Sequence, residues 1–189
     1  MRFRTALTLL LAAVTTAAGC TSAPNNVAGT YYAPEYDYGE FYFVTNNKTF
    51  RVIVSGNPFP DIPQAEMERR LLPVMQANKP QPNLTFTYAV PAEEPHPDYR
   101  LVLVFNAAND LTAERVCANQ IRHKPAPTRP FDLFAVYCRN DLALSQSTAW
   151  TPATSPEDPR VGQLFSNLFI VVFNPFRRPR TALSPFTMF

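Results

Sequence analysis

Hydrophobic and polar residues alternate over several short stretches of the chain, which is the pattern of strands with one buried face. Residues 50–55 and 84–90 show this alternation and are rich in β-branched and aromatic side chains. Residues 99–105 are apolar at nearly every position, so we expect a central strand that is covered on both faces. Residues 131–138 and 142–150 are separated by three polar residues that favour a turn, and they predict a hairpin.

A first helix is expected after the strand that ends before Gly56. Asp61 is placed to cap this helix, and Pro63 would lie in its first turn, where a missing N–H costs nothing. Pro73 is expected to kink or end it, because the proline ring clashes with the carbonyl four residues earlier. The expected apolar face consists of Met67, Leu71, Val74 and Met75.

A second helix is expected to start at Ser155, with Pro156 at its first position and two acidic residues in its first turn. The following apolar residues have helical spacing, although residues 168–173 would also fit a strand. This segment is too short to span a membrane. Residues 109–121 are ambiguous, with a short helix capped by Asn109 or Asp110 as one interpretation.

The order strand, helix, strand, strand, hairpin, helix predicts an α+β or α/β fold. We expect a single mixed sheet of about five strands with two main helices packed on it, in one domain over residues 36–176. A flexible tether over residues 20–35 would precede the domain. The tyrosine-rich segment 31–43 would form a first strand or a strap packed on the domain, with an interaction surface as the alternative.

The first 20 residues have the organisation of a secretory signal. Arg2 and Arg4 precede the uncharged apolar stretch 6–18, which is followed by Gly19 and Cys20. The stretch is shorter than the roughly 20 apolar residues that cross a bilayer, so we expect residues 1–19 to be removed. An ordinary signal peptide with a nearby cysteine is the alternative.

The sequence Ala17-Ala18-Gly19-Cys20 resembles the lipobox of bacterial lipoproteins, although that family usually has leucine where Ala17 stands. The resemblance implies that the thiol of Cys20 carries a diacylglycerol and that the new amino terminus is acylated. Two or three acyl chains anchor a protein stably, whereas one chain binds reversibly. Because Thr21, rather than aspartate, follows the cysteine, the resemblance favours the periplasmic face of the outer membrane.

Removal of the signal makes the chain formally neutral. The full sequence has 17 basic and 15 acidic residues, and the two arginines of the signal account for the difference. Neutrality argues against nucleic acid as a partner, because that affinity comes largely from Lys and Arg contacts to phosphates. The tail 177–189 contains the basic cluster Arg177-Arg178-Pro179-Arg180, which would either contact anionic headgroups or remain solvated.

Two cysteines remain once Cys20 is assigned to the anchor. In an oxidising compartment, Cys117 and Cys138 are expected to form a disulfide that closes a loop containing the proline-rich residues 124–130. A reactive thiol, or a cysteine nucleophile that uses His123 or His96, is the competing interpretation.

Motifs for catalysis or cofactor binding are absent from the sequence: it has no phosphate-binding glycine loop, no G-x-S-x-G, no H-E-x-x-H and no C-x-x-C. Residues 93–98 bring His96 together with three carboxylates, which would bind a cation only weakly because the intervening prolines keep the side chains apart. We therefore predict no catalytic residues, no cofactor and no metal site. Carboxylate pairs for glycan hydrolysis meet only in the fold and leave no motif.

The domain also loosely resembles periplasmic lipoproteins of the curli-secretion lipoprotein and penicillin-binding-protein activator type. The resemblance covers about residues 50–173 and rests on the order of elements and on the apolar strand that opens at Asp98-Tyr99. The missing catalytic motifs, the scarcity of histidine and the modest size of the domain favour a membrane-anchored, non-enzymatic envelope protein with an assembly, scaffold or docking role and an envelope protein as partner. An envelope hydrolase acting on a glycan or peptide is the alternative.

Overall fold

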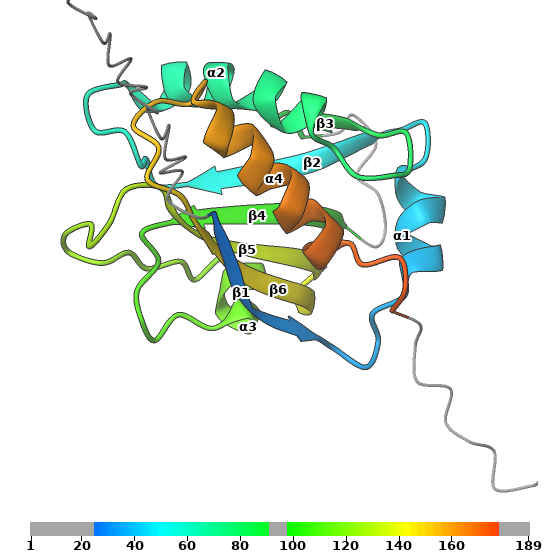
Figure 1. Ribbon diagram of the computed structural model, residues 1–189. Helices are drawn as coiled ribbons and strands as arrows, with labels where there is room; N and C mark the ends of the chain where they lie inside the picture. The colour runs from blue at the N-terminus through cyan, green and yellow to red at the C-terminus, as the bar shows by residue number, and fades with distance from the viewer. Residues whose placement is uncertain (1–24, 91–97, 178–189) are drawn as a thin grey trace, which may run out of the picture.

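A six-stranded mixed sheet organises the chain in the computed structural model, which describes residues 25–90 and 98–177 (Figure 1). The strand order is β1-β6-β5-β4-β2-β3. The strands are β1 (Asn26–Tyr32), β2 (Thr49–Ser55), β3 (Thr85–Thr87), β4 (Tyr99–Phe105), β5 (Asp132–Arg139) and β6 (Leu142–Trp150). The helices are α1 (Tyr38–Thr45), α2 (Gln64–Ala77), α3 (Ala113–Cys117) and α4 (Pro159–Val172). The predicted α+β class with a single mixed sheet is confirmed.

The sheet combines a parallel and an antiparallel part. β2 runs parallel to both β3 and β4, and the β2–α2–β3 crossover is the connection that parallel strands require. β4, β5, β6 and β1 pair antiparallel, and β5 and β6 form the predicted hairpin. Every residue of β4 is buried, as its continuous apolar sequence predicts.

The additional strand is β1, which lies in the segment expected to be a tether. Asn26 to Tyr32 pair with β6, and Ser147 donates a hydrogen bond to the carbonyl of Ala28. The tether prediction is therefore wrong for residues 26–32. Because β1 is a largely exposed edge strand, its residues lack the alternation that marks a half-buried strand.

The tyrosine-rich segment forms helix α1 rather than a continuation of a strand. Asp37 caps this helix, since its carboxylate accepts a hydrogen bond of 2.8 Å from the N–H of Gly39. Phe41 is fully buried. The expected first strand is therefore present only at the start of the segment, where Tyr31 and Tyr32 belong to β1, and the rest of the segment packs on the domain mainly as a helix.

The other helices begin at caps different from those expected. α4 starts at Pro159 and is capped by Asp158. The expected pattern of a capping residue followed by proline is thus present, but three residues later than Ser155 and Pro156. Thr112 caps α3, in place of Asn109 or Asp110. α2 follows Pro63 without a side-chain cap and continues past Pro73 to Ala77.

Helices cover both faces of the sheet. α2 and α4 lie across one face, and their apolar residues join the main core with those of β4 and β5. α3 covers part of the other face over a smaller apolar cluster that includes Val102 and Val136. None of the helices within residues 25–90 and 98–177 has the length and apolar character needed to span a bilayer.

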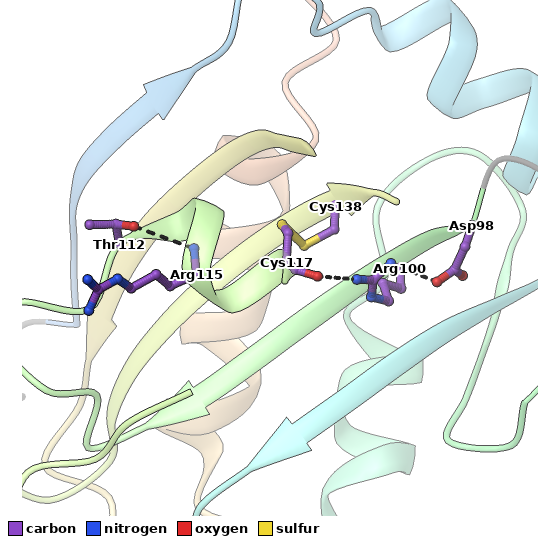
Figure 2. The surroundings of a disulfide bond; sticks show 6 residues. All are labelled: Asp98, Arg100, Thr112, Arg115, Cys117 and Cys138. Atoms are coloured by element: carbon purple, nitrogen blue, oxygen red, sulfur yellow. Dashed lines mark hydrogen bonds and ion pairs between the residues drawn. A yellow bond between two sulfur atoms is a disulfide. The ribbon is translucent and has the colours of Figure 1, made fainter. Parts of the chain in front are cut away.

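A disulfide attaches α3 to the sheet, as predicted. Cys117 ends α3 and is bonded to Cys138 of β5, and both residues are buried. Figure 2 shows Arg100 beside this bond, where its guanidinium donates to the carbonyl of Cys117 at 2.6 Å and pairs with Asp98. Because both sulfur atoms are in the disulfide, neither Cys117 nor Cys138 has a free thiol. The competing interpretation of a reactive or nucleophilic cysteine is therefore wrong at these two positions.

Removing the disulfide should lower the free energy of unfolding. The two cysteines are 21 residues apart, and a closed loop of this size is worth about 3 kcal/mol through the entropy of the unfolded chain. The Cys117→Ser, Cys138→Ser double variant should lose about this amount in urea unfolding followed by Trp150 fluorescence. A double variant as stable as the wild type would contradict the structural role of the bond.

Candidate functional site

One end of the sheet is built mainly from aromatic side chains. Phe41 of α1 stacks on Phe173, with ring centroids 4.3 Å apart, and contacts Tyr137 edge-on at 5.5 Å. Phe50 and Tyr36 add further edge-on contacts to Tyr137. Such contacts are worth about 1 kcal/mol each beyond the burial of area, so they fix α1 firmly to the domain.

The polar contacts of α1 hold it in the same place. Glu40 forms an ion pair of 2.9 Å with Arg139 and accepts a hydrogen bond from the hydroxyl of Tyr99. Burial is the main cause that raises the pKa of Tyr99 to about 12, and this hydrogen bond is the second. Tyr99 is thus a neutral donor at physiological pH, and the charge of Glu40 is balanced within the domain.

The outer side of α1 is apolar and exposed. Phe43 is 77% exposed and Tyr42 is 47% exposed. Phe176, which is 89% exposed, lies at the same end of the sheet, because it follows Phe173, which stacks on α1. We call the surface formed by Tyr42, Phe43 and Phe176 the α1 surface. Large exposed aromatic groups on a rigid support are typical of protein interaction sites.

A polar pocket lies at the other end of the sheet, on the face that α3 covers. Its volume is about 380 Å³. Its polar lining residues are Asn109, Lys124, Arg129, Asp132, Gln146 and Thr148, and Leu111 and Phe134 contribute apolar wall. The pocket is at the opposite end from α1, because Asp132 begins β5 whereas Arg139, the partner of Glu40, ends it.

The carboxylate of Asp132 is at the centre of this pocket and is almost buried. Its two oxygens accept hydrogen bonds of 2.8 Å from Lys124 and Arg129. Burial alone would raise the pKa of Asp132, but the hydrogen bonds from Lys124 and Arg129 outweigh it and hold the pKa below its usual value. The guanidinium of Arg129 also lies 5.6 Å from the ring centroid of Trp150.

A serine and a histidine meet at the end of β2. The Ser55 hydroxyl is 3.1 Å from Nε2 of His123, whose Nδ1 is 2.8 Å from the carbonyl oxygen of Phe105. The carbonyl can only accept, so Nδ1 carries a proton. Gly56 has a φ of +83°, and a Cβ there would come within 3.0 Å of the imidazole ring. The pair connects the 121–124 loop to the sheet, and neither Ser55 nor His123 itself lines the pocket.

The other residues singled out from the sequence are placed as follows. Cys20 and His96 lie outside the described residues, as do Arg178 and Arg180 of the basic tail, and lipidation of Cys20 stays a prediction. Asp98, the last carboxylate near His96, is paired with Arg100. Within residues 25–90 and 98–177, no group of three or more His, Cys, Asp or Glu residues is arranged to hold a metal.

The cluster of Lys124, Arg129 and Asp132 was not predicted from the sequence. Lys124 and Arg129 flank a proline-rich loop, and Asp132 follows immediately at the start of an apolar strand. An acidic residue at the first position of a strand that is otherwise buried requires a cationic partner, and this was the available signal.

Comparisons with known proteins give little further information. Neither a family model nor a curated protein matches the sequence. Among solved structures, a PelC dodecamer from Paraburkholderia phytofirmans is similar at 12% identity over 82% of this chain and 98% of that chain. The TM-score is 0.37, and we base no argument on this similarity.

The stability contributed by Asp132 should depend on pH. Because its pKa is lowered in the folded protein, its stabilising effect is full above the unfolded value of about 4 and is lost as pH falls through the folded value. Asp132→Asn should therefore destabilise the protein at pH 7, by about 2 kcal/mol for hydrogen bonds to a charged group, and by less at pH 3. Urea unfolding at both pH values measures this difference. An equal loss at the two pH values would contradict it.

Proposed function

We propose that this chain is a lipid-anchored protein of the bacterial cell envelope that acts by docking onto another envelope protein, in an assembly or scaffold role. The lipobox-like sequence that ends at Cys20 supports the anchor, with the periplasmic face of the outer membrane as the favoured location. The disulfide between Cys117 and Cys138 supports an oxidising compartment. The exposed α1 surface is the observation that carries the docking role.

The position of β1 limits how far the domain lies from its anchor. Asn26 begins β1 and is six Cα–Cα steps from Cys20, which is about 20 Å when fully extended. The anchored protein is thus held close to the bilayer, with the start of β1 nearest to it. Asn26 pairs with Trp150, so the polar pocket lies at this membrane-facing end of the sheet.

The α1 surface faces away from the membrane in this arrangement. β1 runs from Asn26 toward α1 over seven residues, which adds about 20 Å between the anchor and the α1 end. The charge of Glu40 is balanced by Arg139, and Lys48 lies 5.3 Å above the ring of Phe43. The partner is therefore an apolar patch on another periplasmic protein, rather than lipid, with an acceptor group opposite Lys48.

Hydrolysis of a glycan or peptide is the second candidate, and the pair of Ser55 and His123 is the observation in its favour. A serine hydroxyl beside an imidazole whose other nitrogen is held by an acceptor is the arrangement of an activated nucleophile. The pair does not line the polar pocket, where a substrate would be enclosed, and Gly56 packs beneath the ring as in a structural contact. Docking therefore ranks first.

The lipid anchor is tested by Cys20→Ser. The wild type should incorporate a clickable palmitate analogue and fractionate with membranes, because two or more acyl chains bind stably. The variant should lose both the label and the membrane association. Cys117→Ser with Cys138→Ser is the control and should keep the label. A Cys20→Ser variant that is labelled like the wild type would contradict the anchor.

The docking surface is tested with a photo-crosslinking amino acid in place of Tyr42 in the native envelope. We expect one discrete adduct, and Phe43→Asp should reduce its yield at least tenfold, because it removes the exposed ring and brings a carboxylate into an apolar contact. Phe43→Asp should leave the melting temperature nearly unchanged, since Phe43 is exposed.

Val90→Ser is the control for this experiment, because Val90 is an exposed apolar residue outside α1 that follows the edge strand β3. It should leave the adduct unchanged. An adduct of twice the mass of the chain would show that the partner is a second copy of this chain and not another protein. An adduct to lipid, or one that is insensitive to Phe43→Asp, would contradict docking through the α1 surface.

A further inference from the structure

The polar pocket has more positive than negative charge at its centre. Lys124 and Arg129 each give one hydrogen bond to Asp132, so two cations share one carboxylate. Asp132 is the one carboxylate that forms an ion pair with either of them in the described part of the chain. The nearby Asp110 is paired with Arg122 at the exposed surface. The cluster therefore has a net charge of +1.

Most of the donors on these two side chains are not used by the protein. An ammonium group has three N–H donors and a guanidinium has five, and in the described residues each group gives one hydrogen bond, to Asp132. The two hydrogen bonds go to different oxygens of one carboxylate, so the cationic groups are held close together. Asp132 thus preorganises two cations beside a cavity of about 380 Å³.

The remaining walls indicate what else a ligand would carry. Asn109 and Gln146 present amide groups, and Thr148 presents a hydroxyl group that itself donates to the carbonyl of Ala28. These are neutral partners for hydroxyl groups, whereas Leu111 and Phe134 offer apolar contact to a carbon skeleton. The cavity exceeds the size of a single inorganic anion.

We infer that this pocket binds a phosphate group attached to a small hydroxylated body, such as glycerol phosphate, with the phosphate oxygens between Lys124 and Arg129. Arginine and lysine together are the usual partners of phosphate, and a net charge of +1 balances the single charge of a phosphodiester or part of the charge of a phosphate monoester such as glycerol phosphate. The ligand has two possible sources, a soluble glycerol phosphate or the headgroup of an anionic phospholipid. The second source rests on the proposed anchor, which places this end of the sheet beside the bilayer.

The test is calorimetric titration of the processed protein, purified in a neutral detergent, with sn-glycerol 3-phosphate, inorganic phosphate and dihexanoyl phosphatidylglycerol at constant ionic strength. The wild type should bind sn-glycerol 3-phosphate or the phosphatidylglycerol more tightly than it binds inorganic phosphate. Arg129→Gln and Lys124→Met should each weaken this binding at least tenfold, because each removes one of two charged contacts. Arg69→Gln, which alters an exposed cation of α2 that is paired with Glu66, should leave the affinity unchanged.

The two variants differ in their risk to the fold. Lys124 is mostly buried, whereas Arg129 is about half exposed, and Arg129→Gln leaves Asp132 paired with Lys124. Arg129→Gln is therefore the deciding variant if Lys124→Met unfolds. Tighter binding of phosphatidylglycerol than of sn-glycerol 3-phosphate identifies the headgroup as the source, and the reverse identifies the soluble compound.

The proposal is overturned if none of the three probes binds the wild type at 10 mM, or if Arg129→Gln and Arg69→Gln weaken binding equally. Because the titration with sn-glycerol 3-phosphate does not require lipidation or a docking partner, its failure is distinguishable from failure of the proposed envelope function. Loss of the palmitate label, in turn, would leave a soluble phosphate site intact.

Discussion

The pairing of β1 with β6 is the constraint on which the arrangement of this molecule depends. It joins the first described residues of the chain to the far strand of the hairpin, with Asn26 opposite Trp150 and Tyr32 opposite Ser145. This register fixes which end of the sheet lies next to the residues that lead to Cys20. It also delivers the chain to α1 at the other end, where Ala33 continues the ladder by donating to the carbonyl of Leu144.

The two ends of the sheet have different chemistry as a result. The end near the start of β1 carries a positively charged pocket whose charges are organised by one buried carboxylate. The α1 end is an aromatic cluster in which Glu40 is paired with Arg139, with apolar rings on its outer side. The proposed attachment at one end and the proposed docking at the other both rest on this difference between the two ends.

The sequence predicted those parts of the fold whose residues have a strong pattern. The uniformly apolar β4, the β5–β6 hairpin and the pairing of Cys117 with Cys138 were all predicted, because burial on both faces, a tight turn and an even number of cysteines each leave a local signal. β1 was missed because an edge strand buries little. The helix caps were misplaced by a few residues, since Asp158 and Ser155 offer equivalent signals.

The candidate sites were less predictable, because they depend on residues that meet only in the fold. Nothing local to Lys124 or Arg129 shows that both reach Asp132. Likewise, the aromatic density of residues 31–43 does not show which rings face outward, because Phe41 and Phe43 are two positions apart on a helix and differ completely in exposure. Amide hydrogen exchange of residues 26–32 tests the central claim most directly. The account predicts that the paired amides in β1 exchange slowly and that they lose their protection together with the amides of β6. Exchange of this whole segment at the rate of an unstructured chain would contradict the account.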